Sequence, residues 1–547
     1  MARYHTRCNL SAARFPFISS FHGRSVILPQ QDINFQKSAI FGGADADRDV
    51  GVPQVFYMHN TIPTEQGYQS IGYEQVIEPM LGEVDFDNFI PLQDVLGNKF
   101  LFVPGFGKNY VFDAPTLGWA KINPIVGLET DILVTAAFVQ GVNYVFYEKT
   151  GCFRYNSTTK AFDPVTLTGL TVANIVGIVG SNGYLLAWDI NNVLYWTPIP
   201  TDFTPSLVTG ASSASITDLK GRIVTVHQAI NGFIIYSTGN AVGATFTGNI
   251  RFPFNMKEIP GAGGVRTKEH ISYEYNADSH YAITSAGVQE INKTSSKLLL
   301  PEAADFISGR IFEDFDSATK LFTTTYLTGD TRLKLAVVAA RYLIISYGMQ
   351  SLTHAIVYDF LQKKWGKLKI AHVDCFEYTY PNLYGIVTYQ MLLSLGTTYD
   401  ELIDTTYNDL NSVVATAERP RRTIAFLQQD GTVYIVEMNP GQIDNDSVIL
   451  FGRYQFTRGH MMQLFEIDIE NIDQGSNYAC FILPSYDGKN FAAAVTPTVH
   501  NSSGLVRSFR SRVTAINHTL LFVGSFNLCS YQISYTPAGV ARVHANA

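Results

Sequence analysis

The sequence predicts an all-β protein whose central part is a β-propeller of about six to eight blades. The clearest indication is residues 335–368, where three short apolar runs rich in Val, Ile and Tyr precede a fourth short piece that carries Trp365. The joints between them are polar or contain glycine and are short enough for hairpins. Four antiparallel strands in about 35 residues are the size of one propeller blade. Similar units recur from Phe100 to Met438 at intervals of about 40–50 residues, which sets the expected blade number.

The composition agrees with a β-rich protein of more than one domain. The chain has 547 residues, of which 46% are hydrophobic and 13% aromatic, with many more Tyr and Phe than Trp. Aromatic residues favour pleated, half-buried surfaces, and this length predicts about two or three domains. The net charge of -8 argues against a dedicated nucleic-acid binder, because such a protein needs Lys and Arg to neutralise phosphates. The same negative charge is compatible with a protein surface along which DNA passes while interacting with it only weakly.

The cysteines and the N-terminus indicate folding in a reducing compartment. The cysteines are scattered, odd in number and form no CxxC pair, which predicts free thiols and neither a disulfide framework nor a zinc site: Cys8, Cys152, Cys375, Cys480 and Cys529. Residues 1–17 are basic but lack the apolar core of a signal peptide. No apolar run reaches the ~18 residues of a membrane span. We expect the protein to be made and folded in the cytoplasm, and we expect no membrane span.

Residues 1–95 are expected to form an extended N-terminal arm. They contain six prolines and few long apolar runs, which suits neither helices nor central strands. Such an arm either lies loosely at the surface or packs on a neighbouring subunit, and both interpretations stay open. If it packs on a neighbour, deleting residues 1–95 should leave a soluble monomer that forms no ring.

Residues 96–440 contain the strand groups of the predicted propeller, and Asn-Gly pairs mark several of its hairpins. Both central residues of an Asn-Gly turn can adopt positive φ, as in Asn182-Gly183 and Asn231-Gly232. Five groups precede the one described above: KFLFVPG, NYVFD and GWAKI; LVTAAFV, NYVFYEK and CFRYN; NIVGIVG, YLLAWDI and VLYWTP; SITDL, RIVTVHQ and FIIYSTG; HISYEYN, SHYAITS and VQEIN. The closing part is CFEYTYP, LYGIVTYQ, MLLSLG and RTIAFLQQDGTVYIVEM. A helix-like insertion, PEAADFISGRIFEDF, follows the fifth group.

Residues 441–547 are predicted to form a separate small β-sandwich-like domain. Its strands are VILFGRYQF, MQLFEIDIE, YACFILPSYDG, GLVRSFRSR, LLFVG and CSYQISY. Alternating polarity places one face of a strand in a core and the other in water. In MQLFEIDIE, this pattern predicts that Phe465, Ile467 and Ile469 share the buried face.

A glycosidase or sialidase is the enzyme class that such a propeller could host, and its motifs are missing. The adjacent carboxylates Asp400 and Glu401 would face opposite sides of a strand and could not act on one bond. The nearest match to a sialidase Asp-box, residues 485–488, has its glycine one position early and no Trp. No GxSxG occurs, and the glycine-rich residues 261–264 lack the context of a phosphate loop. We expect no enzyme activity and no catalytic residues.

Metal, cofactor and phosphate sites are not predicted either. Three aspartates alternate like the start of a calcium loop, but valine and phenylalanine stand where the loop needs glycine and glutamate: Asp45, Asp47, Asp49, Val50 and Phe56. No HxH or HExxH occurs, His270 and His280 are expected on different strands, and His227 is expected to be a packed strand residue. The basic run RPRR, residues 419–422, is either a solvated turn or, together with Arg341 and Lys363-Lys364, a surface that meets phosphates or acidic subunits.

Four segments carry a resemblance to a known family. The first is the blade YLIISYG, AIVYD and KKWGKL, in which Tyr358-Asp359 precedes Trp365. The second is the doubled TYDELIDTTYNDL, the third is FGRYQF followed by SYDGKNF, and the fourth is the early phrase NTIPTEQGYQSIGYEQV. Together they resemble the β-propeller tail proteins of short-tailed bacteriophages, the nozzle or tail-tube hub group. The likeness covers most of the chain in organisation and is tight only in these segments.

This resemblance implies a structural virion protein with no catalytic set. Members of the family form a ring, usually of six copies, below the portal and adaptor proteins. Tail fibres or spikes attach alongside, and genomic DNA passes transiently through the centre during ejection. We therefore expect a homo-oligomeric ring, a hexamer, in the virion tail. The alternative is a binding module at the tail tip that recognises a host glycan or a partner protein.

Overall fold

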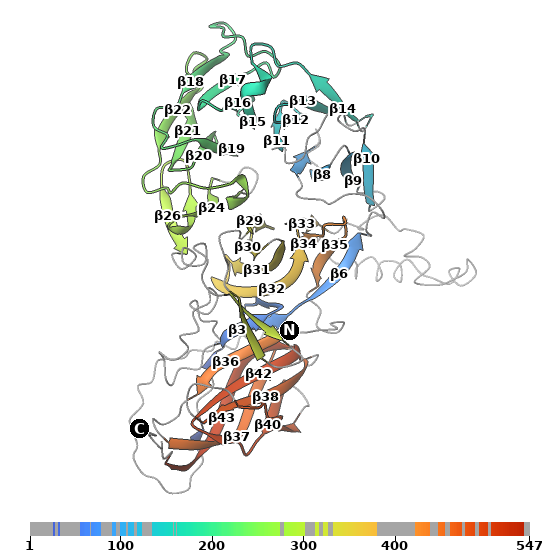
Figure 1. Ribbon diagram of the computed structural model, residues 1–547, viewed down its shortest axis with the longest axis vertical. Coiled ribbons are helices and arrows are strands. Elements are labelled where there is room, and N and C mark those ends of the chain that lie inside the picture. Colours follow the sequence, from blue (N-terminus) through green and yellow to red (C-terminus); the bar gives the residue numbers. More distant parts are fainter. Residues whose placement is uncertain are drawn as a thin grey trace, which may run out of the picture.

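The structure, a computed structural model, is built from β-strands arranged in two domains, a ring of small sheets and a sandwich beside it (Figure 1). The two short helices in the described residues are 3-10 turns, η1 (Val172–Asn174) and η2 (Lys268–His270). The structure describes residues 26–27, 31–32, 55–65, 67–77, 90–93, 99–105, 108–113, 118–122, 134–156, 158–159, 161–273, 278–300, 312–316, 321–325, 332–349, 351–379, 422–437, 447–454, 460–472, 476–486, 492–501 and 505–540.

Seven four-stranded antiparallel blades in the described residues form the propeller, which confirms the predicted fold. Blades 1 to 3 are β7 (Ile90–Gln93), β8 (Lys99–Gly105), β9 (Lys108–Asp113) and β10 (Gly118–Ile122); β11 (Val134–Val139), β12 (Val142–Tyr147), β13 (Gly151–Asn156) and β14 (Ala161–Val165); β15 (Ile175–Ser181), β16 (Tyr184–Asp189), β17 (Val193–Thr197) and β18 (Ser212–Ser215). Blades 4 and 5 are β19 (Ile223–Ala229), β20 (Gly232–Ser237), β21 (Ala241–Phe246) and β22 (Phe254–Glu258); β23 (Ile271–Tyr273), β24 (His280–Thr284), β25 (Gly287–Ile291) and β26 (Ser296–Leu300). Blades 6 and 7 are β29 (Arg332–Val338), β30 (Tyr342–Gly348), β31 (Leu352–Asp359) and β32 (Lys364–His372); β33 (Asp374–Thr379), β34 (Arg422–Leu427), β35 (Val433–Glu437) and β6 (Gly72–Ile77).

Each blade packs face to face against its neighbours, and this explains the apolar runs in the sequence. The second strands β20 and β30 are buried along their whole length, because a strand in the middle of stacked sheets has a core on both sides. Separate apolar clusters fill the spaces between successive blades from blade 1 to blade 7. The Asn-Gly hairpins adopt the predicted conformation, with positive φ at Asn182 and Asn231 and at the glycine after each.

The outermost strand of blade 7 is β6, which lies before blade 1 in the sequence. Strand β6 pairs antiparallel with β35, with Tyr73 opposite Val436. The last blade is therefore completed by a strand from the start of the chain, which ties the end of the propeller to its beginning.

The second domain is a sandwich of two sheets. One sheet has the order β3 (Val55–His59), β36 (Val448–Tyr454), β42 (Asn517–Ser525) and β38 (Asn477–Ser485). The other contains β5 (Tyr68–Ser70), β43 (Asn527–Val540), β37 (His460–Asn471), β40 (Val506–Arg510) and β39 (Thr498–Asn501), with β1 (Val26–Ile27), β2 (Gln31–Asp32) and β41 (Thr514–Ala515) paired at the side. A single core that includes Met58, Phe451, Ile467 and Phe522 lies between the sheets.

A continuous sheet joins the two domains. Strand β32 of blade 6 pairs with β4 (Thr61–Pro63), β4 pairs with β5, and β5 pairs with β43 of the sandwich. This thirteen-stranded sheet runs without interruption from the propeller into the sandwich, as Figure 1 shows below blade 6. The joint between the two domains is therefore made of backbone hydrogen bonds.

The prediction that residues 1–95 form an extended arm is wrong for the described part of that segment. Strand β3 belongs to the sandwich, β4 and β5 to the joint, and β6 and β7 to blades 7 and 1. Strands β3 and β6 pair with strands far away in the sequence, so no local hairpin pattern predicts them, whereas β4 pairs with β5 and β7 pairs with β8. The expected boundary near residue 440 falls between β35 and β36. Deleting residues 1–95 would remove strands from both domains.

Three further sequence expectations need correction. SITDL, expected as a strand, lies after β18 and contributes only its first residue to it. The helix-like insertion ends in strand β27 (Phe312–Asp316), which pairs with β28 (Leu321–Thr325); residues 301–311 lie outside the described part. Phe465 is 43% exposed, whereas Ile467 and Ile469 are buried. A β-bulge between Leu464 and Glu466 shifts the alternation by one position and turns Phe465 outward.

Candidate functional site

The inner strands of the blades surround the propeller axis and run in the same direction. Thr135 Oγ1 of β11 accepts a hydrogen bond from the amide of Ile178 in β15 (2.9 Å). Ser272 Oγ of β23 accepts one from the amide of Val337 in β29 (2.7 Å). Equivalent parts of neighbouring inner strands thus lie side by side. The strand starts gather at one mouth of the axis and the strand ends at the other.

Charged side chains meet at the mouth where the inner strands start. Lys334 Nζ of blade 6 pairs with Asp374 Oδ2 of blade 7, and their side chains are only 12% and 4% exposed. Arg332 Nη2 lies 3.3 Å from Glu269 Oε1 in η2. We name these four residues, together with Lys268, the axial charge cluster.

Lys268 reaches across the axis. Its Nζ donates a hydrogen bond to the carbonyl oxygen of Val134 (3.2 Å). Lys268 precedes blade 5, whereas Val134 starts the inner strand of blade 2. The bond therefore joins blades three positions apart across the start of the axis.

Burial shifts the pKa values of Lys268 and Asp374 toward their neutral forms. Desolvation lowers the pKa of Lys268 to about 8, and the positive charge of Lys334 adds to this effect. Desolvation also raises the pKa of Asp374, and the neighbouring Lys334 opposes the rise. The amide of Cys375 donates a further hydrogen bond to Asp374 Oδ1 (2.8 Å). The mouth is thus held by a compact network of charges that offset one another.

Two histidines pack against each other between blades 4 and 5. His280 Nε2 donates to the carbonyl of Gln228 (2.9 Å), so Nδ1 is the acceptor for the hydroxyl of Tyr236 (3.0 Å). The rings of His227 and His280 lie 6.3 Å apart. Burial lowers the pKa of His227 to about 3 and of His280 to about 4. In the described residues, no three His, Cys, Asp or Glu side chains gather as metal ligands would.

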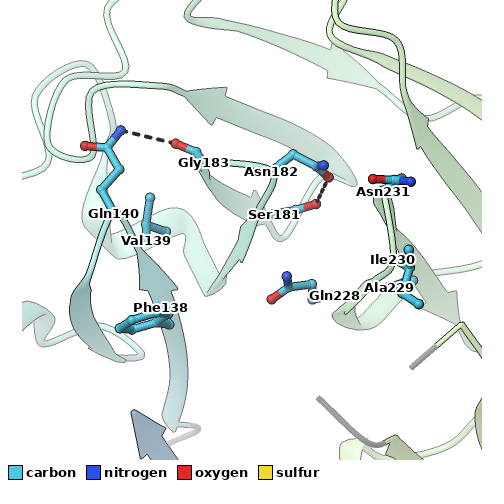
Figure 2. A pocket seen from close by; sticks show the side chains of 10 residues that line it. All are labelled: Phe138, Val139, Gln140, Ser181, Asn182, Gly183, Gln228, Ala229, Ile230 and Asn231. Carbon is cyan, nitrogen blue, oxygen red and sulfur yellow. Dashed lines mark hydrogen bonds between the residues drawn. The ribbon is translucent and has the colours of Figure 1, made fainter. Parts of the chain in front are cut away.

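A pocket of about 400 Å³ opens at the other mouth, where the inner strands of blades 2 to 4 end (Figure 2). Turn and strand-end residues form its wall, among them Gln140, Ser181, Asn182, Gln228 and Asn231. All ten lining residues are uncharged. Sequence analysis identified two of the turns as hairpins but not the pocket, because it forms only when three blades stand side by side.

The residues singled out in the sequence do not come together in the described structure. Arg341 binds Asp359 Oδ2 through Nε (2.9 Å) and Nη2 (2.7 Å), whereas Lys364 Nζ lies 5.9 Å from the ring centre of Tyr68. Residues 261–264 form a loop whose Gly263 amide donates to Gln289 Oε1 (2.8 Å). The aspartates 45, 47 and 49, residues 399–410, 419–421 and 487–488, and Cys8 lie outside the described part.

Searches among protein families and curated proteins find no match to this chain. Several solved β-propellers are similar in fold. BamB from Moraxella catarrhalis is 11% identical with a TM-score of 0.35, covering 71% of this chain and 98% of that one. The WD40 β-propeller domain of Doa1 is 8% identical with a TM-score of 0.37, covering 67% and 98%. YCF48 from Cyanidioschyzon merolae is 12% identical with a TM-score of 0.34, covering 54% and 87%.

These solved structures are related to this chain by fold alone. The seven-bladed arrangement itself rests on the strand pairings of this chain. No helix in the described residues is both long and apolar enough to cross a membrane.

Proposed function

We propose that this chain is a structural part of a bacteriophage tail, a nozzle or hub protein that assembles with copies of itself into a ring. The observation that carries the proposal is the continuous sheet that joins propeller and sandwich. A part that bears load between portal, adaptor and fibres needs domains that keep a fixed relation to each other. The thirteen-stranded sheet supplies that relation through the backbone.

The segment that resembles the opening of the nozzle family lies at this joint. In NTIPTEQGYQSIGYEQV, Asn60 starts the joint and residues 72–77 close blade 7. The Gly67 backbone lies so close to the carbonyl of Leu528 that a side chain would collide with it. Ser70 exchanges hydrogen bonds with Phe526 of the sandwich. The segment NTIPTEQGYQSIGYEQV thus connects the propeller to the sandwich. This structural role supports the resemblance.

In such a ring, DNA would pass between subunits and not along the propeller axis. Lys268 and the axial charge cluster occupy the start of that axis. A channel bounded by several copies requires heterologous contacts that close on themselves. The net charge of -8 suits a wall that holds DNA weakly.

Imaging of the purified full chain tests the proposal directly. We expect mass photometry and negative-stain electron microscopy to show a six-fold ring around a central hole. A variant that lacks residues 1–25 loses none of the described strands and reports whether that segment contributes to ring contacts. Monomers alone at micromolar concentration, with and without adaptor protein, would contradict the proposed ring.

A binding module at the tail tip is the second candidate function. The observation that favours it is the uncharged pocket at the open mouth of the propeller (Figure 2). Pull-down with host cell-wall material separates this candidate from a purely structural role.

A further inference from the structure

We propose that the pocket at the ends of the inner strands of blades 2 to 4 binds a neutral saccharide. The inference deepens the second candidate function and does not depend on ring formation. Its starting point is the chemistry of the lining, which combines amide groups, a hydroxyl and an aromatic ring without any charged side chain.

The amides of Gln140 and Asn182 are oriented by the protein. Gln140 Nε2 donates to the carbonyls of Gly183 (3.3 Å) and Pro198 (2.8 Å), so both of its hydrogens are used. Its Oε1 is left as an acceptor. Ser181 Oγ lies 2.8 Å from the carbonyl oxygen of Gly232 and 2.9 Å from Asn182 Oδ1, and its single hydrogen serves one of these two acceptors at a time. The amide hydrogens of Asn182 bond to no residue that the structure describes and remain as donors.

Gln228 and Asn231 add two more amides, whose side chains make no hydrogen bond to the residues that the structure describes. In Figure 2, Gln228 lies below Ser181, and Asn231 lies to the right of Asn182 on the blade 4 side. Each amide offers a donor and an acceptor. A sugar hydroxyl also donates and accepts, so neighbouring hydroxyls match such a lining.

Two further features favour a neutral sugar over an anion or a lipid. The half-buried ring of Phe138 gives the pocket one apolar wall, against which the C–H face of a sugar can pack. A cation close to the pocket, Lys293, already donates to the carbonyl of Ile230 and lies 3.9 Å from Asp278 Oδ1. The volume of about 400 Å³ lies within the roughly 300–1,000 Å³ of small-ligand sites.

Saturation-transfer NMR on the full chain tests the inference. The neutral probes are maltotriose and chitotriose, and the anionic probes are sialyllactose and inorganic phosphate. We expect transfer to a neutral probe. Gln228→Ala should weaken its affinity about fivefold, as one lost hydrogen bond does, because the Gln228 carbonyl still binds His280. Phe138→Ala should weaken it about tenfold, and Gln362→Ala, in a turn of blade 6, should leave it unchanged.

Three results would overturn the inference. They are no transfer to either neutral probe, equal affinities in wild type and both pocket variants, and tighter binding of an anionic probe than of a neutral one. The saccharide is titrated separately into the monomer fraction and into the ring fraction. Because the pocket lies within one chain, saccharide binding can be present or absent whether or not the ring forms, and the two proposals are tested independently.

Discussion

Asn60 Oδ1 accepts a hydrogen bond from the backbone amide of Lys369 (2.9 Å), although the two residues are 309 positions apart. The same oxygen accepts a bond from the hydroxyl of Tyr73 in blade 7 (3.1 Å). The Asn60 carbonyl accepts bonds from Ser447 Oγ and from the amide of Ile71 (3.0 Å each). One buried residue with a φ of 48° thus ties together both closing blades through its side chain and the start of the sandwich through its backbone carbonyl.

Replacing Asn60 should therefore be costly. We expect Asn60→Ala to lower the free energy of unfolding by about 2–4 kcal/mol, because buried donors lose their acceptor and alanine is strained at positive φ. Urea denaturation measures the change. The matched control is Asn249→Ala, which removes one local bond in an exposed turn and should cost less than about 1 kcal/mol. Equal losses in the two variants would contradict the role of Asn60 as a joint.

A side chain at Gly366 should separate β32 from β4. A Cβ there would lie 2.5 Å from the carbonyl oxygen of Thr61, so Gly366→Val must push β4 away. We expect faster hydrogen exchange in residues 61–63 and a wider range of angles between the two domains in electron micrographs. Lys369→Val introduces the same residue on the exposed side of β32 and should leave both measurements as in wild type.

The protein should lose stability in mild acid. Burial lowers the pKa of His280 and of His372 from 6.5 to about 4. Each is therefore neutral in the folded state, whereas the unfolded chain takes up a proton below pH 6.5. Because the unfolded state binds more protons in this window, stability falls as the pH drops from 6.5 to about 4. Denaturation curves across this range measure the loss, and an unchanged free energy of unfolding would refute it.

Lys268 should also make stability rise with pH, in the alkaline range. Its pKa falls from 10.5 in the unfolded chain to about 8 in the folded one. Between these values the unfolded chain holds the proton that the folded chain has released, so this residue adds stability as the pH rises from about 8. As the pH rises from about 8, the free energy of unfolding of wild type should therefore increase relative to that of Lys268→Met. A difference between the two that stays constant or decreases would show that the amine is not desolvated.

The buried thiols should resist modification in the folded protein. Burial raises the pKa of Cys152 and of Cys375 to about 12, which suppresses the reactive thiolate. We expect neither to react with a thiol reagent until denaturant is added, as peptide mass spectrometry can show. Rapid labelling of either residue under native conditions would mean that its blade opens locally.

The strands that face a core on both sides could be predicted from the sequence, and those at the rim could not. Strands such as β16 and β20 are continuous apolar runs between hairpin signals. The outer strand β18 has the sequence SSAS with alternate residues exposed, and β22 is mostly exposed. Outer strands carry few apolar residues because only one of their edges and part of one face meet the protein.

The candidate site was less predictable than the fold for a related reason. The bond between Lys268 and Val134, and the pocket around Gln228, join blades that are distant in sequence. Each contributing residue is ordinary in its own segment. Only the packing of the blades around the axis brings them together, and no local pattern in the sequence predicts that packing.

The order of strands in the sandwich also sets how this protein can be made. Strand β3 leaves the ribosome early, yet its partner β36 begins at Val448. At roughly 5–20 residues per second, the nascent chain waits on the order of tens of seconds with that edge unpaired. The propeller has to be synthesised in the meantime, and for that time the edge of β3 is a site at which nascent chains can aggregate.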